Sequence, residues 1–372
     1  MLREHLGYLS DKQRLLIFQQ ALGRTVKPGD LIADVGCGFG VLGLFCLEHG
    51  AKQVFGIDQT TAIEIARETM ERAGLSERYV CIAESSFQAE LPELVDIIVC
   101  DHVGYFGIDY GIIKMIRDAS TRFLRPGGRI VPAKIRLLMA GVSNKSGRQR
   151  AEAWKYESIP SEYHWLSEYG LNTSQSREFE KGELRTNAAE LGMIDLEQGV
   201  PDHLTFKAKL EADQDGIIDG ICGWFECELS DGVWMTNSPL AEDRISRDQI
   251  FLPFEAPLRA EAGDVVEITI QIRHEDGLIA WNAKVPEKSW QTKQSNWKSQ
   301  IIGLTDLQPT AKDRALQLNR NGRARRIILE LVDGKKNIEE IECHLLNHHP
   351  NLFPTQSAMI DFVRAELRRN AH

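Results

Sequence analysis

The 372-residue sequence predicts an α/β fold, in which a doubly wound parallel sheet is followed by an antiparallel β-barrel and a small helical domain. Residues 1–132 alternate short apolar runs with helical patterns, which is typical of a parallel sheet with helices on both faces. From residue 133 the runs read as strands without helices between them, and this pattern indicates an antiparallel barrel. From about residue 313 the pattern is helical again.

Each element of the parallel sheet is predicted from its own pattern, because apolar runs bounded by turn residues indicate strands and 3.6-residue periodicity indicates helices. Ligands of such sheets bind beyond the carboxyl ends of the strands. The expected strands are 31–35, 53–57, 79–82, 95–100 and 128–132, and the expected helices are 10–23, 41–49, 61–73 and 111–123. The residues at the strand ends are Gly36, Asp58, Ser86 and Asp101.

The segment LIADVGCGFG, residues 31–40, predicts a ligand site at the first strand end. Glycines let the backbone approach a ligand closely, and the acid that ends the next strand, Asp58, can bind ribose hydroxyls. The GxGxG spacing resembles the S-adenosylmethionine (SAM) loop of class I methyltransferases, which implies a Rossmann-like domain with SAM as the cofactor. A nucleotide-binding turn and a purely structural turn are the alternatives.

Residues 133–305 predict the barrel, because runs such as KIRLLMAGV and GICGWFECEL have the character of antiparallel strands. About residues 146–185 the sequence becomes polar and aromatic, which indicates a helical excursion from the barrel. Three helices are expected after residue 313, with the second opened by Asn337 and the first ending at Gly334.

Composition and charge limit the function classes. The hydrophobic content of 42% and charged content of 26% are those of a globular protein. There is no apolar run of membrane-spanning length and no signal-peptide core, so we expect a cytoplasmic protein without a membrane partner. The net charge of -10 argues against a nucleic-acid partner and suits a cationic substrate. The seven cysteines lack metal spacing, which predicts reduced thiols and no metal.

The plan of sheet, barrel and excursion resembles that of protein arginine methyltransferases over about residues 5–285. The opening YLSDKQR resembles the family helix whose arginine binds the SAM carboxylate, which gives this role to Arg14. AELP at 89–92 resembles the segment that follows the adenine contacts, and the excursion occupies the place of the family's dimerisation arm, which implies a homodimer. The cofactor-binding residues implied are Arg14, Asp34, Gly36, Cys37, Gly38, Gly40, Asp58, Gln59, Ser86, Phe87 and Asp101.

The segment CDHVGYFGIDYG, residues 100–111, carries the predicted chemistry. The family has two glutamates here that hold a substrate guanidinium, and this chain has Asp101 before the Gly-Tyr-Phe core and Asp109 after it. A guanidinium presents donors in a planar fork, which two carboxylates match. We expect both aspartates to bind substrate beside Tyr105, with His102 as a candidate general base. A turn acid and a satisfied loop histidine are the alternative roles of Asp109 and His102.

The chain departs from the family pattern in the segments expected to bind the substrate that accepts the methyl group. Ungapped alignment puts Tyr110 at the second acid position, and the family's Thr-His-Trp loop reads DRISRD at 243–248. Phe87 replaces the family's adenine-side glutamate. These departures leave the SAM loop intact and weaken the expectation of histone-type arginine methylation.

The segment from Leu318 to Ile341 resembles the PqqD-like winged helix that recognises leader peptides of ribosomally synthesised and modified peptides (RiPPs). The resemblance implies that residues 313–372 bind a leader peptide as an added strand. A structural tail and a DNA-binding winged helix are the alternatives.

The predicted function is SAM-dependent N-methylation of an arginine guanidinium, or a similar nitrogen, in a ribosomal peptide that the C-terminal domain recognises. Two other hypotheses remain: a methyltransferase for a free small molecule such as an amino acid, and a non-catalytic SAM-fold scaffold that binds peptides. The intact GxGxG loop and Asp58 count against the scaffold.

Overall fold

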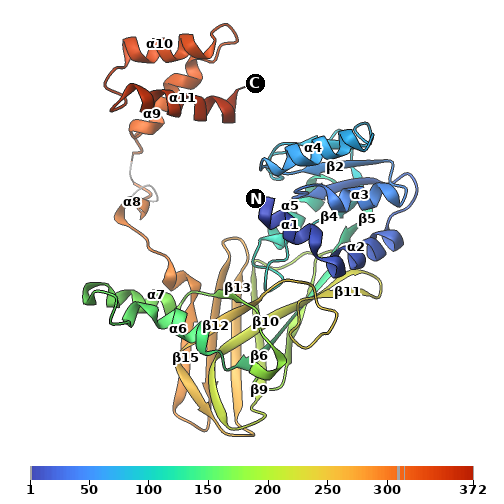
Figure 1. The fold of residues 1–372 in the computed structure, drawn as a ribbon, viewed down its shortest axis with the longest axis vertical. Coiled ribbons are helices and arrows are strands. Elements are labelled where there is room, and N and C mark those ends of the chain that lie inside the picture. The colour runs from blue at the N-terminus through green and yellow to red at the C-terminus, as the bar shows by residue number, and fades with distance from the viewer. Residues whose placement is uncertain (1, 308–310, 314, 372) are drawn as a thin grey trace. The chain divides into compact units, whose positions relative to one another are not determined.

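The computed structural model describes residues 2–307, 311–313 and 315–371, and the chain divides into two compact units, residues 1–300 and 301–372 (Figure 1). The first unit holds the parallel sheet together with the antiparallel sheets. The predicted boundary at residue 132 therefore separates two parts of one compact unit.

A five-stranded parallel sheet in the order β3-β2-β1-β4-β5 forms the N-terminal part of the first unit. Its strand order reverses beside β1, and such a switch point is where ligands of doubly wound sheets bind. The strands are β1 Leu31–Val35, β2 Gln53–Ile57, β3 Tyr79–Ile82, β4 Val95–Val99 and β5 Leu124–Val131. The helices are α1 Leu2–Ser10, α2 Lys12–Thr25, α3 Val41–Glu48, α4 Ala62–Arg72 and α5 Ile112–Arg122.

The predicted strands and helices of this sheet are present, with two differences. Helix α1 was not predicted, and its residues are mostly exposed, so it lacks the buried stripe from which a sequence pattern identifies a helix. Strand β5 begins at Leu124 and therefore includes the RPGG sequence that was expected to be a turn. Its pairing with β4 shifts register between Val95 and Ile97, and this irregularity accommodates Gly127 with its φ of +76°.

The antiparallel part consists of two sheets, one in the order β7-β12-β10-β6-β8 with β11 paired to β10, and one in the order β15-β14-β13-β9. Side chains join them: the Trp281 indole N–H donates to the Pro253 carbonyl at 2.9 Å, and the Thr292 hydroxyl accepts the Glu255 N–H at 3.1 Å. The strands are β6 Lys134–Val142, β7 Gln175–Arg177, β8 Ala189–Asp195, β9 His203–Glu211, β10 Gly216–Ser230, β11 Val233–Thr236, β12 Gln249–Ala260, β13 Val265–Arg273, β14 Leu278–Val285 and β15 Trp290–Ser295.

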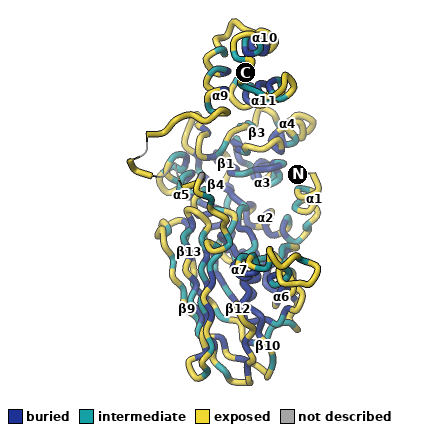
Figure 2. Tube along the Cα trace, turned by 90° about the vertical axis from the view of Figure 1, so that its left-hand side faces the viewer, coloured by how far each residue is buried: buried dark blue, intermediate teal, exposed yellow. Residues whose placement is uncertain are grey.

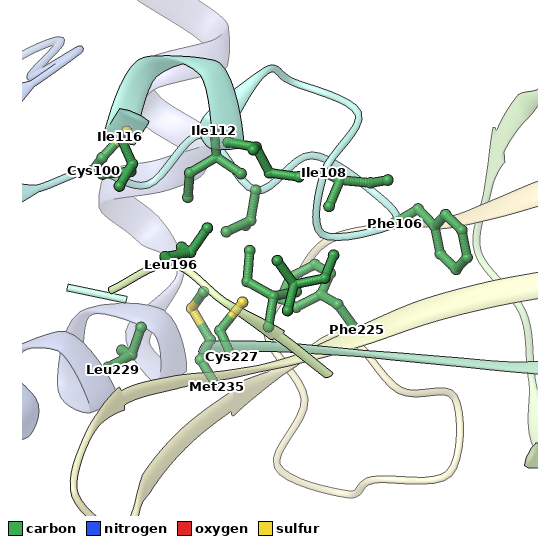
Figure 3. Close-up of a cluster of buried hydrophobic side chains, with 14 of the residues drawn as sticks. Cys100, Phe106, Ile108, Ile112, Ile116, Leu196, Phe225, Cys227, Leu229 and Met235 are labelled. Atoms are coloured by element: carbon green, nitrogen blue, oxygen red, sulfur yellow. The ribbon is translucent and has the colours of Figure 1, made fainter. Parts of the chain in front are cut away.

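The core runs continuously from the parallel sheet into the antiparallel part, where Figure 2 shows β10 and β12 as mostly buried and β9 as mostly intermediate or exposed. Figure 3 shows Phe106 and Ile108, from the loop after β4, among side chains of α5 and of β10. Phe106 is fully buried, and a Cβ on Gly223 of β10 would lie only 2.6 Å from its ring. This packing fixes the loop that carries Asp101.

The segment between β6 and β8 forms short helices, of which α6 and α7 are labelled in Figure 1, and its strand β7 pairs with β12; its role as a dimerisation arm stays a prediction. They are α6 Lys145–Glu152, η1 Ala153–Lys155, η2 Ser161–Leu166, α7 Ser167–Leu171 and η3 Lys181–Glu183. Four of its aromatic side chains are exposed, and Trp165 is the most exposed of them at 60%. The exposed aromatics are Trp154, Tyr156, Tyr163 and Trp165.

The second unit has its own small core, and the last turn of the first unit is η4 Asn296–Ser299. Asn337 caps α10 with a reciprocal bond to Glu340, as the sequence predicted, and Gly334 follows α9 at φ +72°. A winged helix contains a small sheet, but no strand occurs among the described residues from 301 onward. The helices are α8 Leu304–Leu307, α9 Arg320–Leu331, α10 Ile338–His348 and α11 Gln356–Asn370.

All seven cysteines are free: five are buried, Cys81 is partly buried and Cys343 is exposed. Within the described residues no group of three histidine, cysteine or acidic side chains is placed to hold a metal ion. In the same part of the chain, no helix combines the length and the apolar character that crossing a membrane requires.

Candidate functional site

A cavity of about 440 Å³ lies at the carboxyl ends of β1, β2 and β4, where the strand order predicts a ligand. Helix α1 covers one side of it through His5 and Tyr8. Most of the predicted cofactor residues meet here although they come from four segments of the chain. The predicted residues that line the cavity are Arg14, Asp34, Gly36, Cys37, Gly38, Asp58, Asp101 and His102.

The glycine loop is tightly packed by aromatic rings. Gly36 and Gly38 have φ of +70° and +54°, which favours glycine. A Cβ on Gly36 would clash with the ring of His102, and one on Gly38 would lie 2.7 Å from the ring of His5. Asp58 accepts the Gly38 N–H at 2.9 Å, so the ribose acid predicted from the sequence also holds the loop.

Asp34, at the end of β1, connects the glycine loop to neighbouring elements through hydrogen bonds. Its Oδ2 accepts the N–H of Gly43 at 2.9 Å and the Tyr79 hydroxyl at 3.3 Å. Burial raises the pKa of Asp34 to about 7, although both hydrogen bonds act in the opposite direction. This carboxyl joins β1, the start of α3 and β3, which sets the shape of the cavity.

Four predicted cofactor residues, Gly40, Gln59, Ser86 and Phe87, do not line this cavity. Gly40 is the N-cap of α3 at φ +81°, and a Cβ there would lie 2.9 Å from the Tyr79 hydroxyl. The Ser86 carbonyl accepts a bond from Arg122, and Phe87 is 42% exposed. The adenine contacts at Ser86 and Phe87 therefore stay predictions.

A buried ion pair between Arg14 and Asp101 lines the cavity. Nε and Nη2 of Arg14 both lie 2.6 Å from Oδ2 of Asp101. Burial acts to raise the pKa of Asp101, but Arg14 and then Arg247 outweigh it, and the pKa falls below its usual value. Oδ1 of Asp101 is buried and has no hydrogen-bond partner among the described residues. One carboxylate oxygen is therefore occupied and the other is free.

A second cavity of about 360 Å³ adjoins the first, because Glu4, Tyr8 and Tyr110 line both. Tyr105, the predicted substrate residue, lines this second cavity, and its ring meets that of Tyr110 edge to face at 5.4 Å between centroids. A cofactor cavity beside an aromatic acceptor cavity, with Asp101 at the first, suits transfer of a group from one to the other.

Asp109 lies apart from both cavities. Its Oδ2 accepts the N–H of Tyr105 at 3.0 Å and its Oδ1 accepts the N–H of Phe106 at 2.7 Å. Burial raises the pKa of Asp109 although these two N–H groups lower it. The structure thus places this carboxylate in the turn, the alternative role considered from the sequence, and Tyr110 faces the cavities instead.

His102 lines the first cavity and not the second. Its ring packs on Gly36, and its Nδ1 lies 3.8 Å from the thiol of Cys100. Burial lowers the pKa of His102 despite the nearby Asp101, so the imidazole is neutral at pH 7. This position is closer to the cofactor loop than to the acceptor cavity.

Sequence reasoning missed three residues that shape the acceptor side. Arg247, in the DRISRD loop, lies with Nη2 at 3.5 Å from Oδ2 of Asp101. Asn237 is fully buried and donates to the carbonyls of Tyr105 at 2.9 Å and Asp248 at 2.7 Å, which ties the two loops together. Gln249 in turn donates to the Asn237 carbonyl at 2.6 Å. The sequence held one signal for Arg247: the segment DRISRD has an arginine where the Thr-His-Trp loop was expected.

The first cavity fits SAM by its own geometry. The backbone of the glycine loop lines the cavity, Asp58 stands at the adjoining strand end, and Arg14, paired with Asp101, places a buried cation in its wall. SAM consists of a methionine part, a ribose and an adenine, and residues of these types suit its carboxylate and its ribose hydroxyls.

Comparisons with known proteins agree with this geometry. The family model of the ribosomal protein L11 methyltransferase (PrmA) matches residues 17–166. Protein arginine N-methyltransferase 1 of Saccharomyces cerevisiae is 28% identical over 273 residues, 71% of this chain and 78% of the relative. Its Dictyostelium discoideum counterpart is 27% identical over 284 residues, 72% of this chain and 80% of the relative.

Two solved structures share the fold. A chain of the Trypanosoma brucei arginine methyltransferase enzyme–prozyme heterotetramer with AdoHcy has a TM-score of 0.69 and 21% identity, and covers 78% of this chain and 96% of its own. Arabidopsis thaliana protein arginine methyltransferase 10 has a TM-score of 0.68 and 19% identity, and covers 80% and 98% respectively. The match includes the antiparallel sheets, since it extends well beyond the parallel one.

Proposed function

We propose that this SAM-dependent methyltransferase methylates a guanidinium nitrogen of arginine in a peptide. The single observation that carries the proposal is the buried Asp101 carboxylate, whose Oδ2 is held by Arg14 and whose Oδ1 is free. A free carboxylate oxygen in a buried site accepts an N–H of a guanidinium and fixes the orientation of its nitrogens. The yeast and Dictyostelium relatives, which are named arginine methyltransferases, support the same choice.

SAM, when bound, supplies a methyl group already activated on a sulfonium, so the protein's contribution is positioning. Arg14 would hold its carboxylate, the backbone from Gly36 to Gly40 its methionine and ribose parts, and Asp58 the ribose hydroxyls. Asp101, ionised because its pKa is lowered, would orient the acceptor nitrogen. His102 is neutral, so it can accept a proton, and a general-base role for it remains part of the proposal.

Asp109 takes a supporting role in this proposal. Its two oxygens hold the backbone N–H groups of Tyr105 and Phe106 and so set the turn that presents Tyr105. The acceptor side then has one carboxylate from the expected pair, and Tyr110 stands where a second acid was expected.

The proposal also specifies the kind of peptide and the part of the chain that binds it. We take the substrate to be a ribosomal peptide with a leader segment that residues 313–372 bind. The unit has its own core, and residues 311–372 carry 11 basic and 8 acidic side chains, a local excess of three positive charges in a chain of net charge -10. This charge suits an acidic leader.

We also propose that the chain forms a homodimer through the excursion at 146–185. Its exposed aromatics form the kind of apolar surface that a second copy covers. The double variant Trp165→Ser/Tyr163→Ser should sediment as a monomer where the unaltered protein sediments as a dimer.

The test of the function is mass spectrometry of peptides incubated with the enzyme and SAM. Intact leader–core peptide, core peptide alone and free arginine are compared at equal concentration. The proposal expects a methyl group on arginine, with the largest yield from the intact peptide. Methylation of free arginine alone, or of a hydroxyl or carboxylate, would rule out a peptide arginine as the acceptor.

A further inference from the structure

Arg247 stands at the acceptor side of the site although it was not expected there. It belongs to the loop between β11 and β12 and lines the second cavity with Tyr105 and Tyr110. Its side chain is only 9% exposed, and its guanidinium lies 5.7 Å from the ring centroid of Tyr8. A buried cation therefore forms part of the wall that an acceptor group would touch.

The backbone around Arg247 is fixed by hydrogen bonds from three sides. Gln249 donates its side-chain N–H to the Arg247 carbonyl at 3.3 Å, and the Ser246 N–H donates to Asp11 at 2.7 Å. The buried Asn237 amide holds the carbonyl of Asp248 at 2.7 Å. These bonds fix the backbone of the loop, and the buried guanidinium itself contacts Asp101 and the ring of Tyr8.

Two buried polar atoms lack hydrogen-bond partners among the described residues, one on Asp101 of the first cavity and one on Arg247 of the second. One is Oδ1 of Asp101, which needs a donor, and the other is Nη1 of Arg247, which needs an acceptor. Both groups are in ion pairs, but leaving a buried donor or acceptor atom of a charged group without a hydrogen bond is costly. An arginine substrate satisfies Asp101 but cannot satisfy Arg247, because a guanidinium donates and does not accept.

Charge leads to the same requirement. Asp101 already faces two cations, Arg14 and Arg247, and an arginine substrate adds a third. Of the acids that line the second cavity, Asp11 has both oxygens engaged by backbone N–H groups, and Glu4 lies on an exposed part of α1. Asp248 has its pKa raised by burial and by Glu178, and its partner is Ser176. The SAM carboxylate is assigned to Arg14, so a further negative charge beside Arg247 has to come from the substrate.

We propose that Arg247 binds a carboxylate of the substrate, so that the enzyme selects an arginine that has an aspartate or glutamate beside it in the peptide. This inference rests on the proposed arginine methylation and adds the sequence context. A carboxylate matches the free Arg247 nitrogen in geometry and compensates its charge, whereas a basic or glycine-rich context does neither.

The test uses full-length enzyme and three peptides that differ only beside the target arginine, with Asp, Asn or Lys at both flanking positions. Methylation gives kcat and KM, and fluorescence anisotropy gives the affinity of each labelled peptide independently of turnover. We expect the Asp peptide to have a KM and a Kd lower than those of the Asn peptide by about tenfold, with the Lys peptide weakest.

Arg247→Gln should remove the difference between the Asp and Asn peptides, and Arg247→Lys should restore part of it. Arg244→Gln is the matched control, because Arg244 lies in the same loop but bonds to Glu178 and Glu180 outside both cavities. It should keep the full preference. A structural role of Arg247 alone would weaken all three peptides equally.

The inference is overturned if the unaltered enzyme does not distinguish the Asp from the Asn peptide, or if Arg247→Gln keeps the preference. If the Asp peptide binds in an Arg247-dependent way but its arginine is not methylated, Arg247 is supported as a carboxylate-binding residue and the proposed arginine methylation fails. If arginine is methylated without any context preference, the proposed function stands and this inference fails.

Discussion

The two carboxylate oxygens of Asp101 differ in their hydrogen-bond partners. Arg14 holds Oδ2 from two nitrogens, which orients the group and keeps its pKa low, and Oδ1 remains available inside the site. Because the pKa is lowered, the carboxylate stays ionised through neutral and mildly acidic pH. We therefore expect loss of activity on acidification to come from groups other than Asp101.

Asp109 offers a direct test between a turn acid and a substrate acid. Asp109→Asn replaces a carboxylate that accepts two backbone N–H groups by an amide with a single acceptor oxygen, so we expect a loss of about 1–3 kcal/mol in the free energy of unfolding. Urea denaturation measures it. Peptide KM should change little at a temperature where the variant is folded.

The opposite result would restore the role predicted from the sequence. If Asp109→Asn keeps its stability and raises the peptide KM strongly, the carboxylate binds substrate and turns toward the acceptor cavity when substrate is present.

Single residues were predictable where one local segment determines them. Gly36, Gly38 and Asp58 could be identified because a strand, a tight turn and a strand end lie within 28 residues of sequence. The role of Arg247 could not, because its partner Asp101 lies 146 positions away and only the folded loop brings them together. Asp109 was assigned by its place beside the Gly-Tyr-Phe core, and its backbone bonds depend on a turn that a pattern does not specify.

At the scale of elements, the start of α2 joins the two sides of the site. Asp11 is the N-cap of this helix, where it accepts the Arg14 N–H at 3.0 Å, and its other oxygen accepts the Ser246 N–H. One side chain therefore positions both the helix that carries Arg14 and the loop that carries Arg247.

Asp11→Ala should lower the free energy of unfolding by about 1 kcal/mol, as loss of an N-cap does, and should also raise the peptide KM because the Arg247 loop loosens. Urea denaturation and steady-state kinetics measure the two effects. Thr355→Ala removes the N-cap of α11 in the second unit and is the control, since it should leave KM for a short peptide unchanged. Equal kinetics of Asp11→Ala and the unaltered enzyme would contradict this link.

Elements with strong periodicity were predictable and those without it were not. Strand β1 is buried along its whole length, and α11, with 15 residues, is one of the helices expected after residue 313. Helix α1 has no such stripe, and β5 contains a Pro-Gly-Gly sequence that reads as a turn but is absorbed by a register shift. The predicted barrel is two antiparallel sheets, a distinction that depends on which strand edges pair.

At the scale of the whole molecule, every residue assigned to the site lies within residues 1–300, while the second unit packs around its own core. That core consists of Ile328, Ile341, Leu345, Met359 and Val363. The chemistry and the proposed peptide recognition are therefore expected to be separable.

Truncation after Gln300 should leave kcat and KM for a short core peptide unchanged and raise KM for the intact leader–core peptide about tenfold or more. Steady-state kinetics with both peptides measure this. A truncated enzyme that treats both peptides as the full-length enzyme does would show that the second unit has no part in recognition. The winged-helix resemblance would then describe a sequence pattern only.

The measurement that tests the central claim most directly is single-turnover methylation of an arginine peptide, followed by mass spectrometry, with unaltered enzyme and with Asp101→Asn. We expect the methyl group on the arginine side chain and a rate about 100-fold or more lower in the variant, because the acceptor nitrogen loses its charged partner. Calorimetry of SAM binding separates a loss of cofactor affinity from a loss of rate, because Asp101 also pairs with Arg14. Methylation at another atom, or an Asp101→Asn rate close to that of the unaltered enzyme, would contradict the account.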